Sequence, residues 1–387
     1  MDSEAQTNRP ARIAVIGAAW WSQGWHIPQL RRNPNAKLVA IMQRSEQPTA
    51  AAFLNLTLKT KTQLAEEYKV PIYSSCEEMV EDKELMDNLD GVIICTAHSC
   101  HSWMGKMFLD AGKHILMEKP MTVDVAEARE LANQATKAGV TFMVNNTANF
   151  RDQCFEARRL IRNGDVGEIN HVLCVMYSPL MFLFDDPANA SWVKPSGSMV
   201  QPDGSGNGFG WGQSSHVLAW VLGVGGLDAL EVTAMTHRSE KSGGDLMDAA
   251  LIRCRNMEGN ECSISFSAGC GWPGNQYGAT PRGKHFDIKI FGSKGVLMFG
   301  GDDKDRDSGQ LEVRYFDDKK ESYITKGFLM ENGEVEGNGP ESLQHFIAAC
   351  RGLRFENGAD QEVGLQAVKV LDAMYRSAAS KKTEKTR

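Results

Sequence analysis

Three short motifs carry side chains that could hold a nucleotide and move a proton. The first begins at Gly17, directly after the apolar run 11–16. The second, Thr96-Ala97-His98-Ser99-Cys100-His101, follows the run 91–95, and the third, Glu118-Lys119-Pro120, follows the run 114–117. Apolar runs of this length are typical of buried strands. Open α/β sheets bind ligands at the carboxyl ends of their strands, so these motifs predict a binding edge.

The turn at Gly17 is a loose version of the dinucleotide fingerprint G-x-G-x-x-G. In that fingerprint, backbone amides and a helix N-terminus approach a pyrophosphate. Here Gly17 is in place, whereas Ala19 and Ser22 stand where the other two glycines would be. Their small side chains still permit a close approach, but taken alone the turn fits nucleotide binding and a plain tight turn about equally. Trp20 and Trp21 are unusual in such a turn, and we expect them to shape the cofactor pocket.

The end of the second predicted strand, 37–42, favours NADP. An acid at this place would bind the adenosine ribose of NAD, but the sequence reads Gln43-Arg44-Ser45. An arginine can stack on adenine and pair with the 2′-phosphate of NADP. We therefore expect Arg44 and Ser45 to bind NADP, with NAD possible. The alternative is that Arg44 is a solvated loop residue.

The segments that must position these motifs alternate between strand and helix. Strands are predicted at 11–17, 37–42, 72–73, 91–95, 114–117 and 140–144, and helices at 63–68, 76–82, 101–111 and 125–138. This alternation predicts a doubly wound parallel sheet in a first domain, residues 1–145. The segment 47–60 reads as an insertion in one connection.

Beyond residue 145 the pattern changes. A helix near 153–163 precedes strands at 169–177, 230–236, 249–254, 261–267, 286–291 and 311–316. Strands with little helix between them predict a largely antiparallel sheet in an α+β second domain, residues 146–387. Helices at 341–351 and 362–380 close the chain, and we expect the tail 381–387 to be frayed.

Composition excludes several classes of protein. The chain has 387 residues, which favours two domains, and its 42 Lys and Arg against 49 Asp and Glu give a net charge of −7. This acidic balance argues against nucleic-acid or membrane partners. The polar N-terminus has no signal-peptide core, and nine scattered cysteines without a C-x-x-C pair indicate reduced thiols in the cytoplasm. Nothing in the sequence predicts a metal site.

Taken together, the motifs resemble those of the Gfo/Idh/MocA family, the glucose–fructose oxidoreductase and inositol dehydrogenase group. The residues that carry the resemblance are the Gly17 turn with His26 downstream, 90–96 with His101, 112–114 leading to Glu118-Lys119-Pro120, 164–169, the turn 292–295 and the closing helix 364–378. The resemblance implies a Rossmann domain followed by an open-faced sheet domain, and a homodimer or homotetramer formed through that sheet. It also implies that the substrate is a sugar, cyclitol or related polyol.

The resemblance assigns roles to the strand-end motifs. Lys119 inherits the catalytic role of moving the hydroxyl proton, and it also contacts cofactor and substrate. A partly desolvated lysine beside a nicotinamide cation has a lowered pKa, which suits proton transfer. The other expected cofactor-binding residues at these strand ends are Thr96, His98, His101 and Glu118.

The second catalytic element of the family, Asp-x-x-x-His at a helix start, is incomplete here. His216 falls on the histidine, but Gly212 stands where the aspartate should be. His216 is expected to act as general acid or base on the substrate hydroxyl. Gln213 is the nearest residue that could share the task of the missing acid, and the alternative is that His216 only hydrogen-bonds within its helix.

Aromatic residues gather in Gly- and Pro-rich stretches of the second domain. Carbohydrates pack their C–H faces against such rings, but core packing explains single aromatics equally well. We expect Trp211 to be the best candidate for stacking on a sugar. The set comprises Trp192, Phe209, Trp211, Trp272 and Tyr277.

Three functions remain at this point. The leading one is an NADP-preferring oxidoreductase that transfers hydride between nicotinamide and a hydroxyl or keto carbon of a sugar or polyol. The second is a glycosidase or lyase that oxidises its sugar transiently and retains the cofactor. The third is a ligand-sensing regulator, against which the retention of Lys119 and His216 speaks.

Overall fold

A computed structural model describes residues 9–48, 57–194, 208–305, 308–316, 320–324 and 340–387. The chain divides into two compact units, and each is described by itself. The first unit comprises Met1–Thr122, Glu127–Asn145 and Asn332–Gln361. The second comprises Val123–Ala126, Asn146–Glu331 and Glu362–Arg387.

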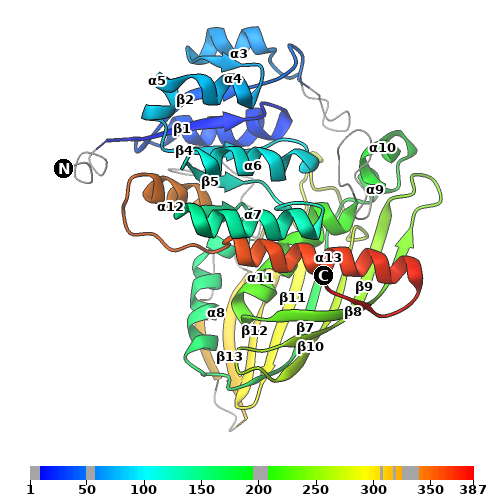
Figure 1. Ribbon diagram of the computed structural model, residues 1–387. Coiled ribbons are helices and arrows are strands. Elements are labelled where there is room, and N and C mark those ends of the chain that lie inside the picture. Colours follow the sequence, from blue (N-terminus) through cyan, green and yellow to red (C-terminus); the bar gives the residue numbers. More distant parts are fainter. Residues whose placement is uncertain (1–8, 49–56, 195–207, 306–307, 317–319, 325–339) are drawn as a thin grey trace. The chain divides into compact units, whose positions relative to one another are not determined.

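The first unit is built on a six-stranded parallel sheet (Figure 1). Its strands lie in the order β3-β2-β1-β4-β5-β6, so the sheet is doubly wound about β1 and β4, as the sequence predicted. β4 and β5 are buried along almost their whole length because helices cover both faces of a parallel sheet. The bounds are β1 Ala11–Ile16, β2 Ala36–Met42, β3 Ile72–Tyr73, β4 Gly91–Ile94, β5 His114–Met117 and β6 Phe142–Val144.

Helices α3, α4 and α5 of this unit begin at side-chain caps, which are Thr60, Ser75 and Asp82. At α3, for example, Thr60 accepts from the Gln63 amide while the Gln63 side chain accepts from the Thr60 amide, a capping box. The helices are α2 Ile27–Arg32, α3 Lys61–Tyr68, α4 Cys76–Glu81, α5 Lys83–Asn88, α6 His101–Asp110, α7 Val125–Ala138 and α12 Glu341–Cys350. Short turns of other helical types lie at Ser22–His26, His98–Cys100 and Thr147–Phe150, the last of them in the second unit.

Helix α12 returns to the first unit from the far end of the sequence. It packs against β1 and β5. A side-chain Cβ at Gly91 in β4 would lie only 2.8 Å from both Phe346 and Cys350 of α12. Glycine at position 91 therefore lets this helix approach the sheet closely.

The second unit contains a sheet of nine strands among the described residues. Their order is β14-β13-β12-β11-β7-β10-β9-β8-β15, and every pairing is antiparallel except that of β7 with β10. The predicted open-faced, largely antiparallel sheet is thus confirmed. The bounds are β7 Ile169–Tyr177, β8 Asp228–Arg238, β9 Asp245–Arg255, β10 Glu261–Gly269, β11 His285–Gly292, β12 Gly295–Asp302, β13 Gln310–Tyr315, β14 Lys320–Ile324 and β15 Glu384–Lys385.

One face of this sheet carries the core of the second unit. Residues alternate between buried and partly exposed along β7, β10 and β11, as a sheet packed on one side requires. Trp220 of α11 stacks on Phe299 of β12, and Ser377 of α13 accepts a hydrogen bond from the Ala234 amide of β8. The helices are α8 Asp152–Arg162, α9 Met181–Phe184, α10 Ala190–Val193, α11 Ser215–Gly225 and α13 Gln361–Ser380, with further turns at Pro187–Asn189 and Gly210–Ser214.

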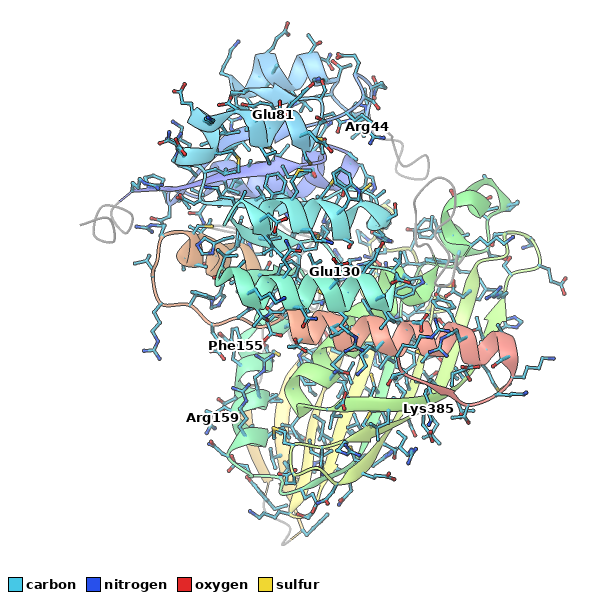
Figure 2. The ribbon with its side chains drawn as sticks, viewed as in Figure 1. Arg44, Glu81, Glu130, Phe155, Arg159 and Lys385 are labelled. Carbon is cyan, nitrogen blue, oxygen red and sulfur yellow. The ribbon has the colours of Figure 1, made fainter. Side chains whose placement is uncertain are left out.

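The expectation of a frayed tail at 381–387 is wrong. Glu384 and Lys385 form the short strand β15, which pairs with Val232 and Glu231 of β8 (Lys385 is labelled in Figure 2). Arg376 holds the segment in place by donating to Glu384 at 2.5 Å and to the Lys385 carbonyl at 2.7 Å. A polar two-residue strand has no hydrophobic alternation, so the sequence pattern could not reveal it.

Candidate cofactor and catalytic site

Gly17 forms a cradle at the carboxyl end of β1. Its φ is +90°, and a Cβ at this position would lie 2.4 Å from the Cys95 carbonyl oxygen and 2.6 Å from Cγ2 of Thr96. Only glycine fits there, because both the backbone angle and the space exclude a side chain. The Ser22 hydroxyl donates to the Gly17 carbonyl. This tight turn, followed by small residues, fits the close backbone approach that a dinucleotide pyrophosphate requires.

Gln43 ties the Gly17 turn to the end of β2. Its side-chain oxygen accepts from the Ala18 amide at 2.9 Å, and its side-chain nitrogen donates to the Ser45 carbonyl at 3.2 Å. The side chain is 8% exposed. The sequence analysis noted Gln43 only as the absence of an acid. Its place directly after a strand was the available signal for this bridging contact.

Arg44 and Ser45 lie where the sequence analysis expected them. They lie two and three residues after the end of β2 and are exposed, and Figure 2 shows Arg44 at the surface of the first unit. A charged side chain in this position is free to reach a phosphate.

The end of β4 carries Thr96, His98 and His101. Thr96 and His98 are partly exposed, whereas His101 is fully buried at the start of α6. The His101 Nδ1 donates to the Pro120 carbonyl at 2.9 Å, and Nε2 lies 3.3 Å from the Thr96 carbonyl. Burial lowers the pKa of His101, so the ring is held neutral. His101 thus ties the β4 motif to the Glu118-Lys119-Pro120 motif.

Glu118 is the centre of a buried hydrogen-bond cluster. Its Oε1 accepts from Trp21 Nε1 at 3.0 Å, from His26 Nε2 at 2.8 Å and from Asn145 Nδ2 at 2.7 Å. The carboxylate side chain is only 9% exposed, and His26 is 3% exposed. These three donors come from the turn after β1, from its helical continuation and from the residue after β6. One carboxylate thereby positions the ends of three segments.

This cluster keeps Glu118 ionised. Burial alone would raise the pKa of the carboxyl, but the hydrogen bond and charge of His26, the charge of Lys119 and the Asn145 bond together lower it to about 2. A fixed negative charge therefore lies beside Lys119. An adjacent carboxylate stabilises an ammonium group and fixes its place.

Lys119 is the partly exposed member of its motif. Its backbone amide donates to Glu118 Oε2 at 3.2 Å, and the peptide bond to Pro120 is cis. Trp21 donates to Glu118, the residue before Lys119. The ring of Trp21 stacks on Trp25 with 5.4 Å between ring centroids, and it meets Trp20 edge-on at 5.2 Å. Trp20 and Trp21 are partly exposed, as residues that line a pocket would be.

His216, Gln213 and Gly212 lie in the second unit, where the turn Gly210–Ser214 passes into α11. His216 is 3% exposed, whereas Gly212 and Gln213 are partly exposed within an otherwise buried segment. Gly212 and Gln213 precede His216 by four and three residues, the separations at which side chains become neighbours on a helix surface. A Cβ at Gly212 would have no neighbour within 4 Å. The space directly beside the Gly212 backbone, where a Cβ would lie, is therefore open.

The predicted aromatic residues divide into buried and exposed ones. Phe209 and Trp211 are fully buried, and the Trp211 ring stacks on Tyr375 of α13 at 5.8 Å. In this unit Trp211 is a packing residue, and its stacking on a sugar stays a prediction. Trp272 stacks on His285 at 4.6 Å, and Tyr277 is 43% exposed. The side chain of Trp192 lies outside the described residues.

The structure thus gathers Gly17, Ser22, Trp21, Thr96, His101, Glu118 and Lys119 at one edge of the first sheet. His216 and Gln213 belong to the other unit, so their cooperation with Lys119 stays a prediction. The contacts that Gln43 makes with the Gly17 turn and that Asn145 makes with Glu118 were not predicted. The sequence analysis named His26 only as part of a resemblance, although a histidine ten residues after a strand end was a usable signal.

Two further findings bear on the kind of site. Within the described part of the chain, no three His, Cys, Asp or Glu side chains form a group that could hold a metal ion. No helix in the same part of the chain is both long and apolar enough to cross a membrane.

Comparisons with known proteins agree with this architecture. An uncharacterized oxidoreductase of Schizosaccharomyces pombe is 28% identical over 165 residues, which cover 41% of this chain and 40% of that protein. The chain therefore matches less than half the length of this relative. The inositol 2-dehydrogenase of Rhizobium meliloti is 24% identical over 79% of this chain and 84% of that enzyme. The crystal structure of an aldose-aldose oxidoreductase from Caulobacter crescentus, complexed with glycerol, has a TM-score of 0.67 at 16% identity, over 97% of this chain and all of that one.

Family models match both parts of the chain. Residues 11–146 match the oxidoreductase family, NAD-binding Rossmann fold, and residues 158–386 match the oxidoreductase family, C-terminal alpha/beta domain. These two matches cover most of the sequence, and the glycine cradle and strand-end motifs lie inside the first. The chain belongs to the Gfo/Idh/MocA family of NAD-binding oxidoreductases.

Proposed function

We propose that this protein transfers a hydride between a nicotinamide cofactor and a hydroxyl or keto carbon of a sugar or sugar-derived polyol. The observation that carries the proposal is the edge of the first sheet, where Trp21, from the turn that begins at Gly17, and the backbone amide of Lys119 both donate hydrogen bonds to Glu118. A turn suited to a pyrophosphate and a partly exposed lysine are the two parts that such a reaction needs.

The residues present fit a nicotinamide dinucleotide. Gly17, Ala19, Trp20, Trp21 and Ser22 would hold the pyrophosphate and the cofactor walls, and Arg44 with Ser45 the adenosine end. At the other strand ends, Thr96, His98, His101, Glu118 and Lys119 would surround the nicotinamide end. The bound cofactor would supply the hydride donor or acceptor. The exposed Arg44 and the lack of an acid among residues 43–45, directly after β2, support NADP as the preferred form.

The proton is handled by side chains of this chain. Lys119 would bind the substrate hydroxyl and take or give its proton, with the ionised Glu118 fixing the backbone of the lysine. His216 would act as the second acid or base, with Gln213 beside it on the same helix face. No carboxylate stands at Gly212, so His216 would work without the acid that the family pattern places there.

The substrate class rests on the relatives. One relative is an inositol 2-dehydrogenase, and one solved structure of the same fold is an aldose-aldose oxidoreductase. A cyclitol and an aldose share several adjacent hydroxyl groups on a ring or chain. We therefore propose a polyhydroxylated substrate of this kind.

The experiment that tests the function measures oxidation or reduction of the nicotinamide cofactor across a panel of sugars and polyols. Lys119→Met should lower kcat at least about 100-fold because it removes the proton-transfer group. Its cofactor affinity should fall only modestly. Lys137→Met is a matched control at the exposed end of α7 and should keep wild-type turnover. Full activity of Lys119→Met would overturn the assignment.

We also propose a homodimer or homotetramer formed through the open face of the second sheet. Met235, Met247 and Leu251 are 78%, 41% and 57% exposed, and the β8–β9 register places all three on one face. Apolar side chains exposed in this way mark a surface that a second copy would cover.

A cytoplasmic location is supported by nine free cysteines, and cell fractionation would test it.

A further inference from the structure

Two buried residues of the second unit, Asp245 and Tyr375, hold the start of the segment that carries His216. Asp245 is the first residue of β9 and has no exposed surface. Its Oδ1 accepts from the Phe209 amide at 2.7 Å, and its Oδ2 accepts from the Gly210 amide at 3.0 Å. The carboxylate therefore receives the first free backbone N–H groups of the turn Gly210–Ser214, as the side chain of a capping residue does.

Tyr375 of α13 completes the arrangement from the other side. Its hydroxyl donates to Asp245 Oδ2 at 2.7 Å, and the Gly210 amide also lies 3.0 Å from the hydroxyl oxygen. A Cβ at Gly210 would come within 2.5 Å of that oxygen. Glycine thus allows the turn, the carboxylate and the phenol to approach one another. The Tyr375 ring also stacks on Trp211, the next residue of the turn.

The charge of the arrangement is compatible with full burial. Asp245 receives three donors, so a negative charge is best stabilised there. The neighbouring Asp248 is 1% exposed, and burial followed by the charge of Asp245 raises its pKa. Burial and both aspartates raise the pKa of Tyr375, so its hydroxyl keeps its proton and remains a donor. The Phe209 amide, the Gly210 amide and the Tyr375 hydroxyl thus all donate to the same carboxylate, that of Asp245.

We propose that Asp245 and Tyr375 are positioning residues that fix the turn Gly210–Ser214 and, through it, the side chains of Gln213 and His216. The hydrogen bonds of Asp245 and Tyr375 to this turn form a clamp, and the relevance of the clamp to turnover rests on the proposed function. The effect of the clamp on the position of His216 is independent of the proposed function. Gln213 lies within the clamped turn, and His216 lies two residues after the end of that turn at Ser214. Any movement of the backbone at Phe209 and Gly210 is therefore transmitted along the first helical turns to both side chains. A displacement of about 1 Å at a reacting group can cost about 100-fold in rate.

The test compares Tyr375→Phe and Asp245→Asn with the wild-type protein. Tyr375→Phe removes one hydrogen bond and keeps the ring that stacks on Trp211. Tyr73→Phe is the matched control, because Tyr73 also donates to an aspartate, Asp82, at 2.6 Å, but in the first unit. Two readouts are needed: the NMR titration of the His216 imidazole, assigned with His216→Gln, and kcat and KM with the nicotinamide cofactor and a sugar or polyol substrate.

We expect Tyr375→Phe to shift or broaden the His216 resonance and to lower kcat about tenfold while KM for the cofactor stays within about twofold. Asp245→Asn should give the larger effect, since its amide group can accept from only one of the two backbone donors. Tyr73→Phe should leave both readouts at wild-type values. A folded Tyr375→Phe with an unchanged His216 titration would overturn the proposal. If no variant and no wild-type protein turns over substrate, the proposed function fails while the NMR result still decides the positioning role.

Discussion

Glu118 and Lys119 divide two tasks between neighbouring positions. Three donors converge on one buried oxygen of Glu118, while Lys119 remains partly exposed. A buried carboxylate with several donors is rigid, and a lysine attached to it through its backbone inherits that rigidity. The lysine that we propose to move the proton is thus placed by its neighbour in sequence.

Arg44 offers a prediction at the scale of one side chain. Arg44→Ala should weaken NADPH binding about tenfold and NADH binding hardly at all, because only NADPH carries the 2′-phosphate that a guanidinium pairs with. Arg32→Ala, at the exposed end of α2, is the control and should change neither. Calorimetric titration of each variant with both cofactors gives the values. An equal loss for both cofactors would remove the argument for NADP.

The sequence pattern places individual residues at strand ends better than it predicts their contacts. Gly17, Lys119 and His101 stand beside strand ends, and such positions are visible in a hydrophobic pattern. The convergence on Glu118 is not, because Trp21, His26 and Asn145 lie 97, 92 and 27 positions from it. Contacts of this kind depend on the winding of the whole sheet. The burial of Trp211 is likewise invisible in a glycine-rich sequence.

At the scale of elements, the predicted strands were best where the chain is wholly apolar. β4 and β5 follow the runs GVII and HILM closely, since a strand buried on both faces needs such residues. β12, β14 and β15 were not predicted. Their glycines, charges or short length weaken the alternating pattern, and their pairing comes from the sheet around them.

The pair formed by β8 and β9 supports a prediction on pH and stability. The pKa of Asp248 is raised above its ordinary 3.8 by burial and by Asp245, against the effect of Thr236 and Arg238 on β8. Tyr375 of α13 faces the same pair of acids. A carboxyl whose folded pKa is raised stabilises the fold at pH below 3.8, and this contribution is lost as pH rises towards the folded value.

Asp248→Asn should therefore unfold at a higher temperature than the wild type near neutral pH, and the difference should shrink towards pH 4. The asparagine keeps the shape of the protonated acid and an oxygen for Thr236 but has no charge to bury. Each pH unit between the two pKa values is worth about 1.4 kcal/mol. Thermal unfolding followed by circular dichroism at several pH values measures the difference. A variant that is less stable at every pH would contradict this description of Asp248.

At the scale of the whole molecule, the order of elements in sequence hides which unit a helix joins. Helix α12 precedes α13 directly, yet it packs on the first sheet while α13 serves the second. The predicted division at residue 145 does not assign α12 to the first unit. The sequence pattern of 341–350 shows that the helix has an apolar face, but it does not show which sheet that face packs against.

The assembly of the molecule is open to a direct test. A second copy on the β8–β9 face would bury Met235 and Leu251, so light scattering should give a mass of at least twice that of one chain. Leu251→Lys should shift the protein towards the monomer, because a lysine there would lose its hydration at the interface. Glu258→Lys, in the turn between β9 and β10, is the control for added charge. A monomeric wild type would contradict the proposal.

Transfer of deuterium from a nicotinamide cofactor deuterated at C4 to a keto sugar or keto polyol tests the central claim most directly. Both C4 positions should be labelled, so that either face of the ring delivers the isotope. We predict that mass spectrometry finds the deuterium on the reduced carbon of the product, and that Lys119→Met gives at least about 100-fold less of it under the same conditions. Product without deuterium, or equal labelling by Lys119→Met, would contradict the account.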